Sequence, residues 1–552
     1  MTERWPTYLI FLPVFLGAGL FVYRRLLRLF HYFQQDEYDS TRFLHWCLAK
    51  RAFDRRGSII ALAGMVVAAG GARYQWPWLA SAAANVAFGA CFVLVALKLE
   101  EDPRTKAKKK LSLTPRARRL LSVAIGMLLV ITAAIWAFSL LHRPAQPLVL
   151  WASILVLFQA LPLVIVAAER ALSLDEARRQ ARFEAQAYAR FRTVHPLTIG
   201  ITGSYGKTTT KTILASLLRS SNPVFAPPLS INTRMGITRQ IREQLLDNDR
   251  YAVIEMGAYQ QGSIQRLCNL VPPNAAIITA VGVMHMERFK SRENVLKAKA
   301  ELAAALPADG ILWINGNDEF ARRVPSVVQT VQPRFYGLVR EKNGEGLDCS
   351  AEIRSITPSG TQLDLRWEGR TYSLLLNLWG DPLVENFVGA FAMAASLGLD
   401  PDVLCAAALN LKPTDHRLQV TRRGKRLFID DAYNSNPIGF AAALDVLHSL
   451  PVTQRILVTP GMVELGTLQA SENELAAKKA AGICEMIVIV GHTNAAALRA
   501  GAMAVESPCP VQIHEVSTPD EAFALINSLA HAEAGVLIEN DLPDLYETSP
   551  RL

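Results

Sequence analysis

Five apolar stretches occupy the first third of the chain, and they constrain its fold more than any other feature. They run over residues 5–23, 58–72, 76–97, 120–141 and 147–168. A helix needs about 20 mostly apolar residues to cross the hydrocarbon core of a bilayer, and four of the stretches are long enough. The stretch at 58–72 is shorter, so a buried core hairpin is the alternative for it. The pattern predicts an N-terminal α-helical transmembrane region over residues 1–168, with about five spans.

Basic residues gather after the first and third stretches, and they set the expected orientation. The first group is Arg24, Arg25, Arg28, Arg42, Lys50, Arg51, Arg55 and Arg56, and the second is Lys106, Lys108, Lys109, Lys110, Arg116, Arg118 and Arg119. Because cytoplasmic loops are enriched in Lys and Arg, we expect an outside N-terminus and a cytoplasmic location for everything after residue 168. This describes a multi-pass protein of the inner, cytoplasmic membrane, without a cleaved signal peptide.

Composition argues against two other classes of protein. The net charge of +9 lies mainly beside the apolar stretches, which indicates a lipid bilayer and no nucleic acid as partner. The seven cysteines are scattered and include no Cys-x-x-Cys pair, which predicts reduced thiols and no zinc site.

A change of pattern follows the last apolar stretch. Residues 169–192 contain no Gly or Pro, so a helical connector is expected over 169–195, with its arginines either on lipid headgroups or in solvent. Short β-branched runs then alternate with helical stretches, which is typical of an α/β fold with a mostly parallel sheet. We expect a P-loop ATPase-like central domain at 196–411 and a Rossmann-like C-terminal domain at 412–552.

The first strand of the central domain, at 197–202, leads into a glycine-rich turn. Its sequence is Gly203-Ser204-Tyr205-Gly206-Lys207-Thr208-Thr209. Glycines let backbone amides approach phosphate oxygens, a lysine supplies charge at the β- and γ-phosphates, and the hydroxyl after it can bind Mg²⁺. Ile201 stands where the general G-x-x-x-x-G-K-[ST] motif has its first glycine, which leaves T-G-[ST]-x-G-K-T. The turn predicts an ATP site in which Lys207 and Thr208 carry these two roles.

This form of the turn resembles the Mur ligase family, and further matches follow in the family's order. They are Asn232 in S-I-N-T, Glu255 at the end of the strand 251–255, His285 after the strand 275–281, Arg417 in D-H-R-L, and Asp431 in D-A-Y-N-S-N-P. With M-V-E-L-G at 462–466, the chain is most similar to the UDP-N-acetylmuramoyl-tripeptide:D-alanyl-D-alanine ligase branch. The resemblance covers about residues 197–552.

The resemblance implies a role for each matching residue. Two Mg²⁺ ions would be held by Thr208, Glu255, His285 and Lys297. Lys297, in V-L-K-A-K, resembles the lysine that the family carbamylates with CO₂, with solvated helix charges at Lys297 and Lys299 as the alternative. The implied ATP contacts are the turn residues 203–209, Asn317, Asp318, Asn386, Arg417 and Asp431. The implied catalytic residues are Lys207, His285, Lys297 and Arg417.

The chain departs from the family pattern in three places. The apolar stretches occupy the position of the small domain that binds the uridine-diphosphate sugar. The family's G-x-H-N-x-x-N segment keeps Asn386 but has Pro382 and Leu383 in place of His and Asn. The branch's Lys-Gly-Ser motif is replaced by Glu539-Asn540-Asp541. The identity of both substrates therefore stays open.

These features predict an ATP-dependent ligase of cell-envelope precursor synthesis, which joins an amine to a carboxylate through an acyl phosphate. The expected partners are a small-molecule amine, either an amino acid or a short peptide, and a carboxylate substrate that is membrane-held or linked to UDP or a lipid. Two alternatives remain. One is a poly-γ-glutamate-type membrane synthase, and the other is a non-catalytic membrane scaffold with a degenerate ligase fold.

Overall fold

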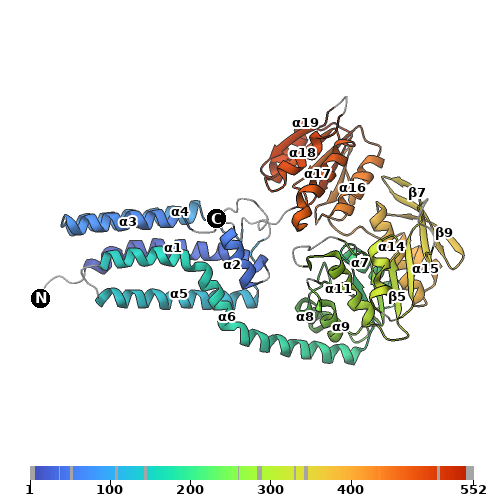
Figure 1. Cartoon of the computed structure of the whole chain (residues 1–552), viewed down its shortest axis with the longest axis horizontal. Helices are drawn as coiled ribbons and strands as arrows, with labels where there is room; N and C mark the ends of the chain where they lie inside the picture. The colour runs from blue at the N-terminus through green and yellow to red at the C-terminus, as the bar shows by residue number, and fades with distance from the viewer. Residues whose placement is uncertain are drawn as a thin grey trace. The chain divides into compact units, whose positions relative to one another are not determined.

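The computed structural model describes residues 6–36, 38–49, 54–105, 110–141, 146–258, 260–282, 289–328, 331–340, 346–433, 435–506 and 510–541. The chain divides into two compact units, a helical unit up to Arg179 and a second unit from Gln180 onward. Figure 1 shows the helices of the first unit and the two sheet-containing domains of the second. Each unit has hydrophobic clusters of its own.

The helical unit consists of five long helices and one short one within the described residues. They are α1 (Pro6–Gln35), α2 (Ser40–Ala49), α3 (Arg56–Arg73), α4 (Trp78–Lys98), α5 (Pro115–Leu141) and α6 (Gln146–Val194). In that part of the chain, four segments are long and apolar enough to cross a membrane: Ile10–Gln35, Trp78–Lys98, Pro115–Ser139 and Pro147–Val194. α3 has an arginine at each end and falls outside this set.

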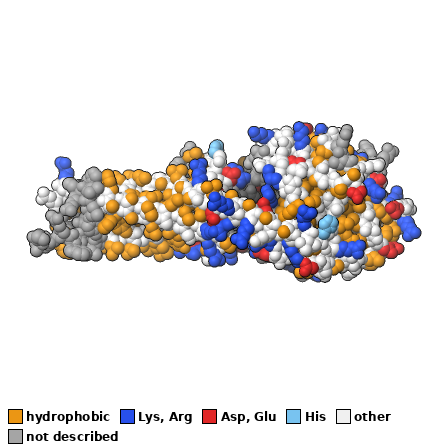
Figure 2. Space-filling view, turned by 90° about the horizontal axis from the view of Figure 1, so that it is seen from below, with side chains coloured by type: hydrophobic (Ala, Val, Ile, Leu, Met, Phe, Trp, Pro, Cys, Tyr) orange, Lys and Arg blue, Asp and Glu red, His pale blue; other side chains and the backbone are white. Residues whose placement is uncertain are grey.

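The outside of the helical unit is apolar. Val66, Leu129 and Val130 are 72, 66 and 69% exposed. Figure 2 shows hydrophobic side chains along the sides of this unit, with Lys and Arg gathered at one end. Soluble proteins rarely expose apolar patches of this extent, so the surface fits the hydrocarbon of a bilayer and the charged end fits its headgroup region.

Glycines bring the backbones of these helices into direct contact. A Cβ atom at Gly17 in α1 would lie 2.3 Å from the carbonyl oxygen of Gly89 in α4, so neither position has room for a side chain. A Cβ atom at Gly64 in α3 would lie 2.5 Å from the Trp151 ring in α6. Small residues at helix interfaces are typical of membrane bundles, where close van der Waals packing drives association.

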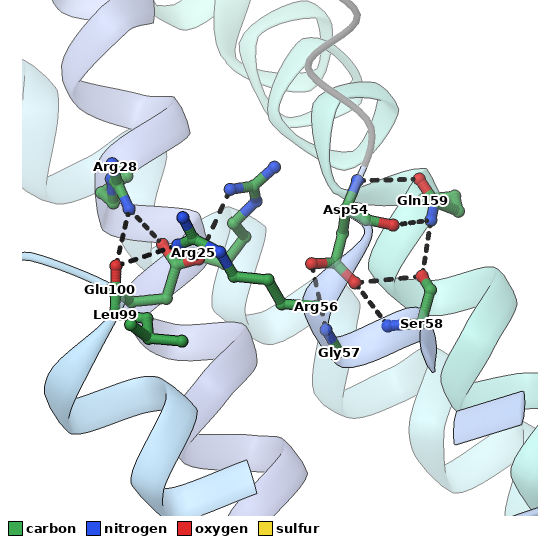
Figure 3. A network of polar contacts seen from close by, with 9 residues as sticks. All are labelled: Arg25, Arg28, Asp54, Arg56, Gly57, Ser58, Leu99, Glu100 and Gln159. Atoms are coloured by element: carbon green, nitrogen blue, oxygen red, sulfur yellow. Dashed lines mark hydrogen bonds and ion pairs between the residues drawn. The ribbon is translucent and has the colours of Figure 1, made fainter. Parts of the chain in front are cut away.

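A network of polar side chains lies at one end of the helical unit (Figure 3). Its centre is the Glu100 carboxylate, whose side chain is 0% exposed and which pairs with Arg28 at 2.8 Å, Arg25 at 3.5 Å and Arg56 at 3.8 Å. Arg28 belongs to α1, Arg56 begins α3, and Glu100 follows the end of α4. The chain therefore returns to this end after α4, and α3 and α4 form an antiparallel hairpin.

A second part of the network connects the start of α3 to α6. Asp54 Oδ2 accepts hydrogen bonds from the backbone N–H and the hydroxyl of Ser58, at 2.7 and 3.0 Å. Gln159 Nε2 donates to the Asp54 carbonyl oxygen and to Ser58 Oγ, both at 2.7 Å. The 18 residues of α3 extend about 27 Å, so α3 has nearly the length of a span although its hydropathy falls short.

The second unit begins with a mixed sheet of nine strands in the order β2-β3-β1-β4-β5-β6-β7-β8-β9. The strands are β1 (Leu197–Thr202), β2 (Val224–Phe225), β3 (Tyr251–Glu255), β4 (Ala275–Ile278), β5 (Ile311–Asn315), β6 (Pro333–Leu338), β7 (Cys349–Thr357), β8 (Gly360–Trp367) and β9 (Arg370–Leu376). Pairing is parallel from β2 to β7 and antiparallel from β7 to β9.

Helices cover this sheet on both faces, which is why its central strands are continuous apolar runs. They are α7 (Lys207–Arg219), α8 (Arg234–Gln244), α9 (Ser263–Leu270), α11 (Arg292–Ala304), α12 (Glu319–Arg322), α13 (Val324–Val327), α14 (Asp381–Ser396) and α15 (Pro401–Ala408). α7 and α14 pack in one hydrophobic cluster with β1, and α11 packs in the other.

The C-terminal domain has a six-stranded sheet in the order β10-β11-β15-β12-β13-β14. Its strands are β10 (Gln419–Arg423), β11 (Arg426–Asp431), β12 (Gln454–Thr459), β13 (Met486–Val490), β14 (Gln512–Val516) and β15 (Ala534–Glu539), and its helices are α16 (Pro437–Ser449), α17 (Gln469–Ala481), α18 (Ala495–Met503) and α19 (Pro519–Leu529). Only the β10–β11 pair is antiparallel in this sheet. The predicted fold class, helical N-terminal region plus two α/β domains, is confirmed.

Candidate active site

The glycine-rich turn lies between β1 and α7, at the carboxyl edge of the central sheet. Gly206 has φ of 78°, in the left-handed region that favours glycine. A Cβ atom there would lie 2.4 Å from Asn386 Oδ1, so a larger residue would collide with α14. No side chain caps the start of α7. The backbone N–H groups of its first turn are therefore available to phosphate oxygens.

Lys207, the first residue of α7, folds back over this turn. Its Nζ donates hydrogen bonds to the carbonyl oxygens of Gly203 and Ser204, at 2.7 and 3.2 Å. Burial lowers the pKa of Lys207, the negative charge of Glu255 opposes this shift, and the positive charge of Arg417 adds to it. Because its acceptors are neutral carbonyl groups, the ammonium group remains available for an anionic ligand.

Glu255 ends β3 beside the turn and is 1% exposed. Thr208 Oγ1 donates a hydrogen bond to Glu255 Oε2 at 2.8 Å, and Asn232 Nδ2 donates to Oε1 at 2.8 Å. Lys211 Nζ lies 3.7 Å from the same carboxylate, and burial lowers the pKa of Lys211 while Glu255 raises it. The structure thus brings together Thr208 and Glu255, two of the expected metal ligands, with Asn232 beside them.

These oxygens fit a hard cation such as Mg²⁺. The Thr208 hydroxyl contacts both the Glu255 carboxylate and, at 3.2 Å, the Ser230 hydroxyl. Within the described residues there is no group of three or more His, Cys, Asp and Glu that could hold a metal ion by itself. Mg²⁺ is commonly held by one or two carboxylates together with substrate phosphates, which matches this donor set.

The two remaining expected metal ligands are His285 and Lys297. His285 lies outside the described residues. Lys297 is exposed on α11, so the expectation that it holds a metal does not fit the geometry. Lys299, two positions further along, is 3% exposed. Burial lowers the pKa of Lys299 well below its usual value, the charge of Lys207 lowers it further, and Glu255 raises it.

The helical pattern of α11 explains why the two lysines differ. Successive residues of a helix are rotated by about 100°, so positions 297 and 299 face directions about 200° apart. Val295 and Leu302 are 1 and 0% exposed, and Lys299 lies four residues after one and three before the other. It therefore shares their buried face, and this spacing is the signal in the sequence that distinguishes Lys299 from Lys297.

The C-terminal domain contributes Arg417 and Tyr433 to the same place. The Arg417 guanidinium lies over the Tyr433 ring at 4.3 Å. Tyr433 Oη donates a hydrogen bond to Ser230 Oγ at 2.6 Å, and Ser230 contacts Thr208. Sequence reasoning missed Tyr433 and Ser230, although both stand inside motifs that it used. Side chains from both α/β domains thus meet at the turn.

The backbone around Arg417 is strained. Its neighbours His416 and Leu418 have φ of 58° and 46°, in the left-handed region that residues with a Cβ atom rarely adopt. Asp431 helps to hold this segment, because its Oδ1 accepts a hydrogen bond from the backbone N–H of Leu418 at 3.1 Å. Burial raises the pKa of Asp431 to about 6, and Arg417 opposes the rise.

A cavity of about 690 Å³ opens beside the turn, which is large enough for a nucleotide base and sugar. Asn317, Asp318 and Asn386 line it, as expected, together with Tyr205 and Gly206. Their polar groups also serve the fold: Asn317 Nδ2 donates to the Leu338 carbonyl at 3.0 Å, Asp318 accepts from the Ala321 N–H at 2.7 Å, and Asn386 Oδ1 accepts from Thr210 at 3.1 Å.

Glu385 lines the same cavity and was not predicted. Its Oε2 accepts a hydrogen bond from Asn315 Nδ2 at 3.2 Å, and its Oε1 accepts one from Arg340 at 3.3 Å. Burial raises the pKa of Glu385 to about 7, and Arg340 opposes the rise. Glu385 belongs to the G-D-P-L-V-E-N segment, where the chain departs from the family pattern.

Known proteins match this part of the chain. Residues 201–394 match the Mur ligase middle domain, and residues 416–539 match the Mur ligase glutamate ligase domain. A UDP-N-acetylmuramoyl-tripeptide–D-alanyl-D-alanine ligase from Mycobacterium tuberculosis is 31% identical over 325 residues, which are 56% of this chain and 61% of that protein. The chain therefore spans less than two thirds of this relative's length.

Solved structures agree on the fold. The crystal structure of MurF from Acinetobacter baumannii has a TM-score of 0.57 and 27% identity, covering 64% of this chain and 75% of that one. MurF ligase from Thermotoga maritima in complex with ADP has a TM-score of 0.59 and 23% identity, covering 66% of this chain and 80% of that one. The two domain matches together cover more than half of the sequence, and the chain belongs to the Mur ligase family.

Proposed function

We propose that this protein is an ATP-dependent ligase that forms an amide bond between a carboxylate substrate and an amine in cell-envelope precursor synthesis. The observation that carries the proposal is the meeting of Lys207, Glu255 and Arg417, contributed by two domains, at a phosphate-binding turn. The name of the M. tuberculosis relative, a tripeptide–D-alanyl-D-alanine ligase, supports the reaction class. The ADP complex of the T. maritima structure supports a nucleotide at this fold position.

In the proposed mechanism the carboxylate attacks the γ-phosphate of ATP, and ADP leaves. The amine then displaces phosphate from the acyl phosphate and forms the amide. Lys207 and the N-terminus of α7 bind the phosphates, and Arg417 approaches them from the C-terminal domain. Mg²⁺, when bound beside Thr208 and Glu255, supplies positive charge at the transferred phosphoryl group. Closure of the C-terminal domain over the turn excludes water from the acyl phosphate.

For the second metal position we propose Lys299 in place of Lys297. Burial lowers the pKa of its amine well below the usual value, which favours the neutral form. The neutral amine would attack CO₂, giving a carbamate and releasing one proton. The carbamate would be an anionic oxygen ligand in a place where Lys207 and any bound Mg²⁺ supply positive charge. His285 is retained as a proposed ligand on the resemblance alone.

Variants of the two lysines test this proposal. Lys299→Ala should remove activity, and a short carboxylic acid such as acetate should restore part of it by occupying the place of the carbamate. Lys297→Ala is the matched control and should keep nearly full activity. If Lys297→Ala removes activity and Lys299→Ala keeps it, the metal ligand is Lys297 and the proposal for Lys299 is wrong.

The carboxylate substrate is proposed to be held at the membrane. The helical unit occupies the position of the family's small UDP-binding domain, and α6 continues from the helical unit to within three residues of β1. A lipid-linked carboxylate would be presented to the ligase unit from the bilayer surface. A polymer-forming synthase of the poly-γ-glutamate type is the second candidate, because the same ATP chemistry would serve it.

The decisive experiment is a product search. The purified full chain is incubated with ATP, Mg²⁺, membrane lipid extract and a mixture of amino acids and dipeptides, and products are analysed by mass spectrometry. A lipid-linked product with one added amine supports the proposal, whereas a ladder of repeated additions identifies a polymerase. If the wild type, like Lys207→Ala, forms no ATP-dependent product, the protein is a non-catalytic scaffold.

The proposed orientation has its own test. Cysteine is introduced at Gln75, in the turn between α3 and α4, and at Lys425, in the C-terminal domain, both exposed. In intact cells a membrane-impermeant thiol reagent should label Gln75→Cys and leave Lys425→Cys unlabelled. The opposite pattern would place the ligase unit outside the cell.

A further inference from the structure

Two carboxyl groups lie side by side at the carboxyl edge of the C-terminal sheet. Asp431 and Glu539 are register partners of the parallel strands β11 and β15. The Asn540 N–H donates to the Asp431 carbonyl oxygen at 3.2 Å, which continues the pairing beyond β15. Glu539 is 0% exposed and Asp431 is 8% exposed. Neither group can be hydrated as a free carboxylate would be.

One buried oxygen of this pair has no hydrogen-bond donor. Glu539 Oε1 accepts a hydrogen bond from Ser435 Oγ at 2.5 Å, and Asp431 Oδ1 accepts from the Leu418 N–H. Glu539 Oε2 is buried and has no donor among the surrounding groups. Because Asp431 and Glu539 are register partners on neighbouring parallel strands, their side chains leave the sheet on the same face, and each acts on the pKa of the other. Two carboxylates are acceptors only, so a hydrogen bond between them requires a proton on one of them.

The charges around the pair lead to the same result. Arg417 is the cation that acts on both carboxyls, while Asp430 adds a negative charge near Asp431. Asp430 is itself engaged by His416, whose Nδ1 lies 2.8 Å from its Oδ2. Two buried negative charges against a single guanidinium would leave one without compensation, which costs several kcal/mol.

We propose that Glu539 is protonated at neutral pH and donates a hydrogen bond from Oε2 to Asp431, so that the pair carries one negative charge opposite Arg417. Glu539 is then a positioning residue. It fixes the Asp431 carboxylate, which in turn accepts from Leu418 and holds the strained segment that presents Arg417. The consequence for catalysis rests on the proposed function, whereas the presence of the proton does not.

The more buried partner keeps the proton. Burial raises the pKa of Glu539 well above its usual value, and the charge of Asp431 raises it further, while Ser435 and Arg417 oppose these effects. Asp431, which retains some exposure and two stabilising partners, is the member that ionises. The shared proton also explains why a glutamate is tolerated at the fully buried end of β15.

Infrared difference spectroscopy tests the proton without using activity. Spectra of the full chain in detergent at pH 7 are compared for the wild type and Glu539→Gln. The difference spectrum should show the loss of one protonated carboxyl C=O band. Loss of a carboxylate band in its place, with no change in the protonated region, would overturn the proposal. Glu533→Gln, which changes an exposed glutamate in the same domain, is the control and should remove only carboxylate absorption.

Stability and turnover then test the role of the hydrogen bond. Because the folded-state pKa is raised, the favourable contribution of Glu539 is present at low pH and is lost as pH rises, so the stability gap between Glu539→Gln and the wild type should change with pH. Glu539→Ala should lower kcat/KM about tenfold or more, and Glu539→Gln, which can still donate to Asp431, should recover most of it. Equal losses in both variants would show that shape, and not the donated hydrogen bond, is what position 539 supplies.

Discussion

The helical unit and the ligase unit each bury one glutamate among several cations, and they differ in what the cations contact. In the helical unit, Arg25, Arg28 and Arg56 lie 2.8 to 3.8 Å from the Glu100 carboxylate. In the ligase unit, Glu255 accepts hydrogen bonds from Thr208 and Asn232 and has Lys211 at 3.7 Å, while Lys207 donates to a backbone carbonyl oxygen. The cations of the first site complete the fold, whereas Lys207 in the second is held ready for a ligand.

The contacts of Lys207 illustrate this difference. Lys207 donates to backbone carbonyl oxygens, and the positive charge of Arg417 acts on it and lowers its pKa. Gathering like charges in this way costs folding free energy, which a bound triphosphate would return. A buried cluster whose cations already contact a carboxylate therefore indicates a structural role, and one whose cation donates only to neutral groups indicates a binding site.

The largest effect is expected from Glu100→Ala in the helical unit. Removing the carboxylate that pairs with these three arginines leaves their buried positive charge less compensated, at a cost on the order of 3–5 kcal/mol. Thermal unfolding of the full chain in detergent or lipid nanodiscs measures it. If the melting temperature is unchanged, water reaches the arginines and Glu100 is not needed to stabilise them. The structural role assigned to this cluster would then be wrong.

The ligase site should show the opposite behaviour, with a large effect on activity and little on stability. Lys207→Ala should lower the rate of ADP release about a hundredfold or more, which corresponds to roughly 3 kcal/mol of transition-state stabilisation. Unfolding should be unchanged, because the ammonium group satisfies no carboxylate. Lys478→Ala, an exposed lysine in α17, is the control. Equal losses of stability in Lys207→Ala and Glu100→Ala would remove the distinction between the two sites.

The contribution of Glu385 to the stability of the ligase unit should depend on pH. Its pKa is raised from 4.5 to about 7, so its contribution to stability is fully present below pH 4.5 and is lost as pH rises through 7. The shift corresponds to at most about 3 kcal/mol. Glu385→Gln, measured without nucleotide, should therefore gain stability relative to the wild type between about pH 5 and 8. A constant difference over this range would show that Glu385 is ionised throughout.

The smallest effect is expected at a surface pair. Glu533 lies 3.5 Å from Lys425, with side chains 55 and 74% exposed. Exposed pairs contribute between 0 and about 1 kcal/mol, so Glu533→Ala should change the free energy of unfolding by no more than about 0.5 kcal/mol. This variant sets the baseline for the three above. A larger loss would mean that charge pairing alone, independent of burial, explains the effect of Glu100→Ala.

The elements that a local pattern determines were predictable from the sequence. β1, β3 and the turn between β1 and α7 follow from buried apolar runs and glycines, whereas the role of Glu255 beside Thr208 came from the family resemblance. The family resemblance added Arg417 and Asp431, whose long-range contacts no local pattern contains. Lys299 was predictable from the helical spacing of α11 but was passed over, because both lysines stand in the matching segment.

Features that depend on contacts distant in sequence were not predictable. The first apolar stretch ends at residue 23, yet α1 continues to Gln35, and its buried Arg25 and Arg28 pair with Glu100. The contribution of Tyr433 depends on its bond to Ser230, 203 residues earlier in the chain. The place of Glu385 likewise follows from a cavity that residues of several separate segments line.

The pairing of α1 with Glu100 also sets an order for biogenesis. Arg25 and Glu100 are separated by 75 residues in the sequence. At a synthesis rate of about 5–20 residues per second, the carboxylate follows the arginine out of the ribosome by roughly 4–15 s. During this interval Arg25 and Arg28 lack the carboxylate that they face in the finished structure, so these ion pairs form only after the α3–α4 hairpin has been made. A ribosome paused before residue 100 should therefore carry a first helix without these ion pairs, and they should form when the pause is released.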